Sequence, residues 1–145
     1  VAGKMDNRVI AAYQQLGFKL VVDPSVNYSG YFDARSRSIT MKQIDDSVYH
    51  ELGHFLAFIA GNADKTASFQ SIFAAEKANV TAFNKAYVTQ NASEYFAESV
   101  KDYILNNASL KNTRPQTYAA VQNALNQITD AQIAKIQKIY GAFWN

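Results

Sequence analysis

The sequence predicts an α+β fold, in which a small sheet near the N-terminus is followed by a mostly helical remainder. Apolar and polar residues alternate only within residues 18–41, whereas apolar residues elsewhere in the chain recur every three to four positions. No repeat, low-complexity tract or linker divides the 145 residues, of which 48% are hydrophobic. Because this length and composition can build one core, we expect a single domain over residues 1–145.

The first two elements are expected to be a helix and a strand. Residues 4–16 have the helical spacing of apolar side chains, and Gly17 stands at the position of a helix C-cap. Residues 18–22 then alternate as a strand does, and Asp23-Pro24 ends the pattern with a turn.

Two short strands and a longer helix are expected next. The strands cover residues 31–33 and 37–41, and the second alternates hydroxyl side chains with larger ones. Asp45 and Asp46 are both good N-caps for a helix that runs to Gly61. Its apolar stripe consists of Val48, Leu52, Phe55 and Ile59.

The remainder of the chain is helical by pattern. Pro115 marks one helix start, because proline is favoured in the first helical turn. The expected helices cover residues 66–77, 93–106, 113 or 114 to about 127, and 130–140.

Composition excludes several classes of function. Lysine and arginine (14) barely outnumber aspartate and glutamate (12) and form no basic stripe, so we expect no nucleic-acid partner. The longest apolar run, residues 55–60, is too short for a membrane span. No cysteine is present, so a metal ion must be held by His, Asp or Glu. Because the chain begins at Val1 with no export segment, we expect a mature or trimmed form.

The central motif is His50-Glu51-Leu52-Gly53-His54, an H-E-x-x-H pattern inside a predicted helix. Four residues advance a helix by about one turn, so both imidazoles can reach one ion at about 2.0 to 2.1 Å. Glu51 is rotated from His50 by roughly 100°, which places its carboxylate beside a metal-bound water as a general base. The simpler alternative is two ordinary helix histidines, but both histidines of the chain fall in this motif. Gly53 inside a helix suggests a close approach to another element.

A catalytic zinc needs a third protein ligand. Glu94 and Glu98 lie one turn apart on an expected helix, so Glu94 is a candidate ligand and Glu98 a candidate acceptor for the second N–H of a ligand histidine. The alternatives are a helix cap formed by Asn91 with Glu94, and a surface pair of Glu98 with Lys101. Glu76 is the competing ligand.

A family resemblance is carried by residues 50–54, by the run Glu94-Tyr95-Phe96-Ala97-Glu98-Ser99, and by Tyr87 seven positions before that run. With these residues the sequence resembles the catalytic domain of anthrax lethal factor and its smaller secreted relatives, the Pro-Pro endopeptidases, which are gluzincin-type zinc metallopeptidases. The likeness extends over about the C-terminal two thirds of the chain, including residues 65–75 and 114–118.

The resemblance implies a secreted bacterial metalloendopeptidase with a zincin-like fold, which has a small mixed sheet. It implies that His50, His54 and Glu94 bind one Zn²⁺ ion, that Glu51 is the catalytic base, and that Tyr87 is the catalytic tyrosine. Glu98 would orient a ligand histidine. From its residue type alone, Tyr87 would more often be a packing or surface ring.

The resemblance also implies an extended peptide or protein substrate lying along the strand before the motif helix, at residues 36–41. If that strand is a sheet edge, β-augmentation can hold the peptide backbone. The side chains expected to contact it are Tyr31, Ser38 and Thr40, with Tyr28 and Phe32 as further pocket candidates or ordinary core residues. Ser93 stands where the Pro-Pro endopeptidases have an acidic residue, so cleavage of proline-rich substrates and a broader or lethal-factor-like specificity both remain open. We expect a monomer.

Two rival hypotheses remain. One is a zincin-fold module that binds peptides with weak catalysis or none. The other is a structural metal site, although such sites usually have four protein ligands and are rich in cysteine.

Overall fold

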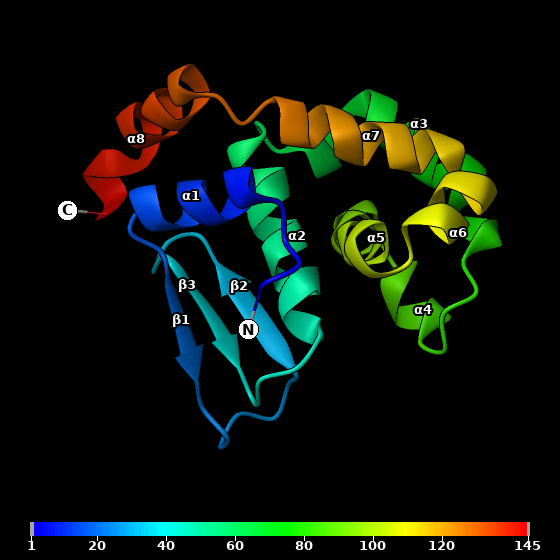
Figure 1. The fold of residues 1–145 in the computed structure, drawn as a ribbon, viewed down its shortest axis with the longest axis horizontal. Helices are drawn as coiled ribbons and strands as arrows, with labels where there is room; N and C mark the ends of the chain where they lie inside the picture. Colours follow the sequence, from blue (N-terminus) through cyan, green and yellow to red (C-terminus); the bar gives the residue numbers. More distant parts are fainter. Residues whose placement is uncertain (1, 145) are drawn as a thin grey trace.

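The computed structural model describes residues 2–144 and places a three-stranded sheet beside a larger group of helices (Figure 1). The elements in chain order are α1 (Asn7–Gln15), β1 (Lys19–Val22), β2 (Gly30–Asp33), β3 (Ser38–Met41), α2 (Ser47–Ile59), η1 (Ala63–Lys65), α3 (Ala67–Glu76), η2 (Lys77–Asn79), α4 (Lys85–Val88), α5 (Ala92–Leu105), α6 (Asn107–Thr113), α7 (Pro115–Asn126) and α8 (Asp130–Trp144). The predicted α+β class, with a mixed sheet first and helices after it, is confirmed.

The sheet has the strand order β1-β3-β2, so the strand before the motif helix is its central strand. β3 pairs in parallel with β1 and antiparallel with β2. The expectation that residues 36–41 form an edge for a peptide is therefore wrong, because both edges of this strand are already paired. The free edges belong to β1 and β2.

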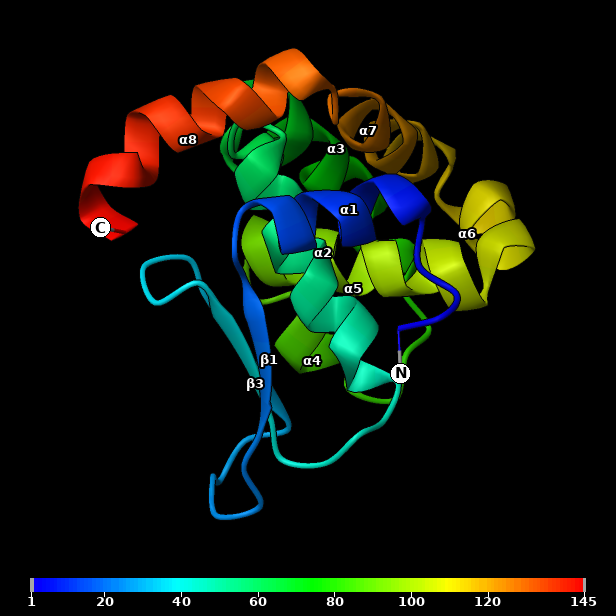
Figure 2. The same cartoon turned by 60° about the vertical axis from the view of Figure 1, so that its left-hand side comes forward.

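One face of the sheet packs against α2 (Figure 2). Ile39 and Met41 point toward the helix and are buried, and the register puts Phe32 beside Ile39 on that face. The same register puts Tyr31 beside Thr40 on the opposite face, which no helix of residues 2–144 covers. The alternation expected for this strand is therefore confirmed.

Helices α2 and α5 approach each other at Gly53. A Cβ atom at this position would lie 2.7 Å from the Cα and carbonyl oxygen of Ala97, so only glycine allows this separation of the two backbones. The close approach predicted from Gly53 is confirmed. Its consequence is that the histidine face of α2 lies directly against the glutamate face of α5, and His50 and Glu51 are buried together with the apolar stripe.

Several helices differ from their predicted bounds. α1 starts at Asn7, where the Asp6 side chain accepts a hydrogen bond from Arg8 N, rather than at residue 4. The short helices α4 and α6 and both 3₁₀ turns were not expected. α8 continues past residue 140 to Trp144, because the indole N–H of Trp144 bonds the carbonyl oxygen of Ala34 beside the sheet. Within residues 2–144, no helix is long and apolar enough to cross a membrane.

Candidate metal centre

The centre of the site is the meeting point of two imidazoles from α2 with one carboxylate from α5. Glu94 Oε1 lies 2.9 Å from His50 Nε2 and 3.2 Å from His54 Nε2. One possible ligand atom from each of these three side chains lies within 4.8 Å of the other two. Two imidazoles and a carboxylate form a nitrogen and oxygen donor set that can hold one divalent ion.

The position of Glu94 follows from the start of α5. The Asn91 side chain accepts a hydrogen bond of 2.8 Å from Glu94 N and so caps the helix. The capping alternative considered from the sequence is therefore present, and it leaves the Glu94 carboxylate available to the histidines. A helix cap and a metal ligand are compatible here, because the cap uses the backbone of Glu94 and the metal would use its side chain.

Glu98, one turn further along α5, holds the other side of the His50 ring. Its Oε1 atom lies 2.8 Å from His50 Nδ1, while its Oε2 atom is 4.0 Å from Lys101 Nζ. An acceptor at Nδ1 favours the tautomer whose Nε2 lone pair points toward Glu94 and His54. The surface pair of Glu98 with Lys101 is therefore present as well, but at a longer distance than the hydrogen bond between Glu98 and His50.

Glu76, the competing ligand, lies elsewhere. Its carboxylate accepts hydrogen bonds from the backbone N–H groups of Gln116 and Thr117 and from the Thr117 hydroxyl, at 3.0, 2.8 and 2.7 Å. Glu76 therefore caps the N-terminus of α7, where a carboxylate also complements the helix dipole. The structure does not bring it to the histidines.

The charges of the cluster are strongly coupled. Burial opposes the charged form of His50, but the hydrogen bonds that its ring donates to the carboxylates of Glu94 and Glu98 outweigh burial and raise the pKa of His50 to about 9. The same bonds from His50 and His54 hold the pKa of Glu94 far below its usual value. A metal ion competes with protons for these imidazole nitrogens, because only the neutral ring has a lone pair to donate.

Glu51 lies beside the cluster against the start of β2. It is only 7% exposed, and burial raises the pKa of its carboxyl group above the usual value. A Cβ atom on Gly30 would lie 2.8 Å from Glu51 Cγ and 3.1 Å from Glu51 Oε2. The absence of a side chain at Gly30 therefore leaves the space that Glu51 occupies.

Tyr87 reaches the same site from α4. The centroid of its ring lies 6.4 Å from that of His50, and the side chain is 54% exposed. Burial, followed by the charge of Glu94, raises the pKa of its phenol, so the hydroxyl stays protonated and can donate a hydrogen bond. Nothing in the helical pattern distinguishes this tyrosine from the others; the resemblance alone pointed to it.

A cleft of about 460 Å³ opens beside the cluster, between the start of β2, α2, α4 and α5. The residues lining this cleft are Tyr28, Ser29, Gly30, Ser47, His50, Glu51, Asn84, Tyr87, Glu98 and Lys101. Tyr28 was a pocket candidate, whereas Gly30, Ser47 and Asn84 were not identified from the sequence. They come from different elements and share no sequence pattern, so only the tertiary contacts reveal them.

The three expected substrate contacts do not line this cleft. Ser38 and Thr40 lie on the central strand, and their side chains point to the sheet face opposite α2. Tyr31 lies on the free-edge strand β2, but its side chain is beside Thr40 on that same outer face and packs near Tyr28, with ring centroids 5.8 Å apart. Phe32 faces inward instead and stacks on His54, with ring centroids 6.4 Å apart.

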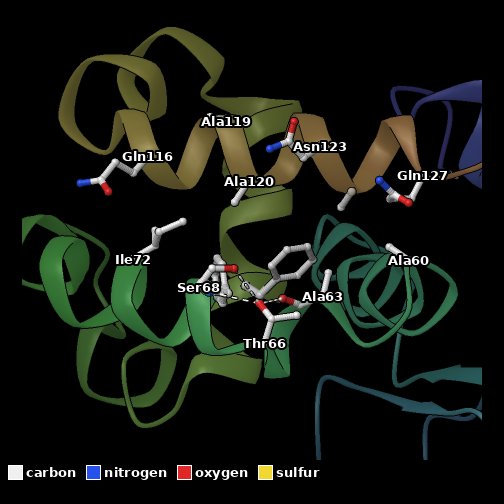
Figure 3. Close-up of a pocket in the computed structure, with 13 residues that line it drawn as sticks. Ala60, Ala63, Thr66, Ser68, Ile72, Gln116, Ala119, Ala120, Asn123 and Gln127 are labelled. Atoms are coloured by element: carbon white, nitrogen blue, oxygen red, sulfur yellow. Dashed lines mark hydrogen bonds between the residues drawn. The ribbon is translucent and has the colours of Figure 1, made fainter.

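A second hollow, of about 520 Å³, lies between α3 and α7, away from the metal cluster (Figure 3). Its lining combines alanines, amides and hydroxyls with three larger apolar side chains, Phe69, Ile72 and Phe96, and includes no titratable group. This second hollow therefore offers no acid, base or metal ligand of its own.

Comparison with known proteins agrees with this geometry. Residues 19–124 match the family described as anthrax toxin lethal factor, N- and C-terminal domain. The matched range contains the sheet, both histidines, Tyr87, Glu94 and Glu98. A search among curated proteins found no match. The family match covers most of the chain, so the chain belongs to the anthrax toxin lethal factor N- and C-terminal domain family.

Proposed function

We propose that this protein is a zinc-dependent metalloendopeptidase in which His50, His54 and Glu94 hold the ion. The observation that carries the proposal is the convergence of these three side chains, with possible ligand atoms within 4.8 Å of one another. Three protein ligands leave a fourth position for water or substrate, as catalytic zinc sites require. The metalloprotease chemistry of the lethal factor family supports the same conclusion.

In this proposal the chain supplies the proton transfers and the hydrogen bonds. A bound zinc ion would supply Lewis acidity, which activates water and polarises the peptide carbonyl. Glu51 accepts a proton from the attacking water and passes it to the leaving amine, a role suited to a buried carboxylate with a raised pKa. The phenol of Tyr87 donates a hydrogen bond to the oxyanion as it develops. Glu98 keeps His50 in the orientation and tautomer that ligation needs.

The free edge of β2 suits an extended peptide. Lys42 N donates a hydrogen bond to Ser29 O, one position before the start of β2. Because hydrogen-bonded and non-hydrogen-bonded pairs alternate along an antiparallel ladder, Tyr31 and Asp33 are then the residues of β2 whose backbone groups face β3. Gly30 and Phe32 then direct their backbone N–H and C=O groups away from β3, toward the edge of the sheet, where the N–H of Phe32 faces the Glu51 carboxylate. A substrate strand can pair with these groups, and β2 replaces residues 36–41 as the proposed peptide-binding strand.

The remaining features of the proposal follow from the resemblance to the Pro-Pro endopeptidases. It supports a secreted, monomeric, single-domain enzyme of the gluzincin type, with proline-rich peptides among the substrates to test. Pairing with only every second residue of the substrate tolerates proline at the intervening positions, because proline lacks a backbone N–H.

The test is cleavage of a peptide library, including proline-rich members, by the zinc-loaded protein, followed by mass spectrometry. Glu51→Ala is the control, because it removes the proposed base and leaves all three proposed ligands. Cuts that disappear in Glu51→Ala would support the proposal and give the specificity.

Peptide binding without Glu51-dependent cleavage, at one zinc per chain, would instead favour a peptide-binding module on this scaffold. A fourth protein ligand found by X-ray absorption would favour a structural metal site. Among residues 2–144, the cluster contains only three groups that could ligate.

A further inference from the structure

The cleft beside the metal cluster adjoins a neighbouring hollow of about 460 Å³. This neighbouring hollow lies between the loop of residues 79–84 and the helices α5 and α6. Asn84, Glu98 and Lys101 line both spaces, so the two spaces meet at these side chains. A peptide that extends out of the cleft past Asn84 would therefore enter the neighbouring hollow.

Lys101 brings an uncommitted positive charge to the junction. Its side chain is 29% exposed, and its nearest carboxylate oxygen, Glu98 Oε2, is 4.0 Å away, beyond hydrogen-bond length. Nothing else in the described part of the chain forms an ion pair with it. A lysine ammonium has three N–H donors, and a partner entering the junction could accept from them.

The acidic groups near this junction already have other partners. Glu98 accepts a hydrogen bond from His50 Nδ1 through its other oxygen. Asp102 is paired with the buried guanidinium of Arg114. Asp45 accepts hydrogen bonds from the Ser47 backbone and from Gln43. The carboxylates close to Lys101 are thus engaged in bonds that hold the site or the fold together.

The lining of the neighbouring hollow suits a polar side chain. Its polar lining consists of the charged side chains of Glu98, Lys101, Asp102 and Arg114 and of amide and hydroxyl groups from Asn79, Thr81, Asn84, Asn106, Ser109 and Thr113. Phe83, in the loop at the same hollow, is fully exposed and offers a flat apolar surface to a bound chain. A carboxylate-bearing side chain could therefore be bound by Lys101 while amides and hydroxyls solvate the rest of the hollow.

We propose that the neighbouring hollow is a substrate subsite and that Lys101 selects an acidic residue of the peptide there. This inference rests on the proposed peptidase function and names the substrate class, namely extended peptides with a glutamate or aspartate near the bond to be cut.

The test is equilibrium binding of fluorescent peptides to zinc-loaded Glu51→Ala protein, which binds without cutting. A parent peptide that binds the zinc-loaded protein carries Glu, Gln or Lys at successive positions along its length. At one position, Glu should bind about fivefold more tightly than Gln, the effect of one partly exposed ion pair. Adding Lys101→Gln should remove that preference, and adding Lys101→Glu should reverse it in favour of Lys. Lys135→Glu on α8, an exposed lysine outside both spaces, is the charge-matched control and should leave the preference intact.

Two results with the Lys101 variants would overturn the inference. One is a preference for Glu that survives Lys101→Glu. The other is an equal loss for all peptides together with weaker zinc binding, which would mean that Lys101 acts only through Glu98 and His50. Binding shows the selectivity even if the intact protein hydrolyses nothing, so failure of the proposed peptidase function is seen separately. Conversely, Glu51-dependent cleavage without any acidic preference would overturn only the assignment of Lys101.

Discussion

Gly30→Ala tests whether the position of Glu51 depends on the empty space at the start of β2. The added Cβ would lie 2.8 Å from Glu51 Cγ and 3.0 Å from Met41 Sδ, each well inside normal contact. Met41 is fully buried, so Glu51 must give way, by roughly 1 Å if ordinary carbon–carbon contact of about 3.5 to 4.0 Å is restored. A displacement of that size at a catalytic group costs about 100-fold in rate.

The assay is kcat/KM on a peptide from the cleavage library, measured together with zinc content and thermal unfolding. Zinc content should stay at the wild-type value, because the three atoms nearest to the added Cβ belong to Glu51 and Met41 and not to a proposed ligand. Gly141→Ala in α8 is the matched control: a Cβ there meets nothing within 4 Å, so activity should be unchanged and helix propensity should add about 0.5–1 kcal/mol of stability. A Gly30→Ala enzyme with unchanged kcat/KM and full zinc would refute the reasoning, because Glu51 would then either not need its present position or not be the base.

The other predictions concern the metal, the oxyanion and the packing of the two central helices. Glu98→Gln should weaken zinc binding by about 10- to 100-fold, since it loosens the hold on His50; competition with a chromophoric chelator measures this, and an unchanged affinity would contradict it. Tyr87→Phe should lower kcat by about 100- to 1,000-fold with little change in KM, and steady-state kinetics that show the reverse would remove the phenol from the reaction. When free zinc is kept at 100 times the Kd of the site, its removal by a chelator should lower the free energy of unfolding by about 2.7 kcal/mol and the Tm by several degrees. A Tm that the chelator does not change would argue against a site formed only in the folded state. Gly53→Ala should cost about 1–3 kcal/mol by overpacking against Ala97, measured by urea unfolding, and a neutral result would mean that α2 and α5 separate readily.

The metal cluster was predictable because its parts are local. His50 and His54 share a face of one helix by spacing alone, and Glu94 with Glu98 does the same on another. The structure then brings the two faces together, and Glu98 Oε1 lies 2.8 Å from His50 Nδ1. The spacing could not decide whether Glu94 or Glu76 lies beside the histidines, because that depends on tertiary contacts. In the structure Glu76 caps α7 instead.

The peptide-binding strand was not predictable in the same way. Alternation shows that residues 38–41 form a strand, but it says nothing about which neighbours pair with it. β1 and β2 are not neighbours, so the chain passes over one strand position between them, and the hairpin from β2 to β3 then places β3 in the middle of the sheet. The expected contacts at Ser38 and Thr40 assumed an edge, and they do not line the cleft because the strand order is set by pairing rather than by sequence position.

Short helices escaped prediction for a related reason. α4 has four residues and α6 seven, so neither shows enough apolar repeats to reveal its period. α4 nevertheless carries Tyr87 to the cluster, so the position of this side chain depends on a segment whose own pattern is weak. Such a segment is held by its tertiary contacts, which local propensity does not report.

The packing at Gly53 links the metal site to the fold as a whole. α2 lies on the sheet, α5 contacts α6 and α7, and the two helices meet where Gly53 faces Ala97. His50 and His54 belong to the first helix and Glu94 to the second, so an ion bound by all three would bridge this interface. Any substitution that widens the spacing between α2 and α5 must then lengthen the distance between ligands, which predicts that zinc affinity and helix packing fall together. The loss of zinc affinity in Gly53→Ala should therefore exceed that in a surface variant of equal stability.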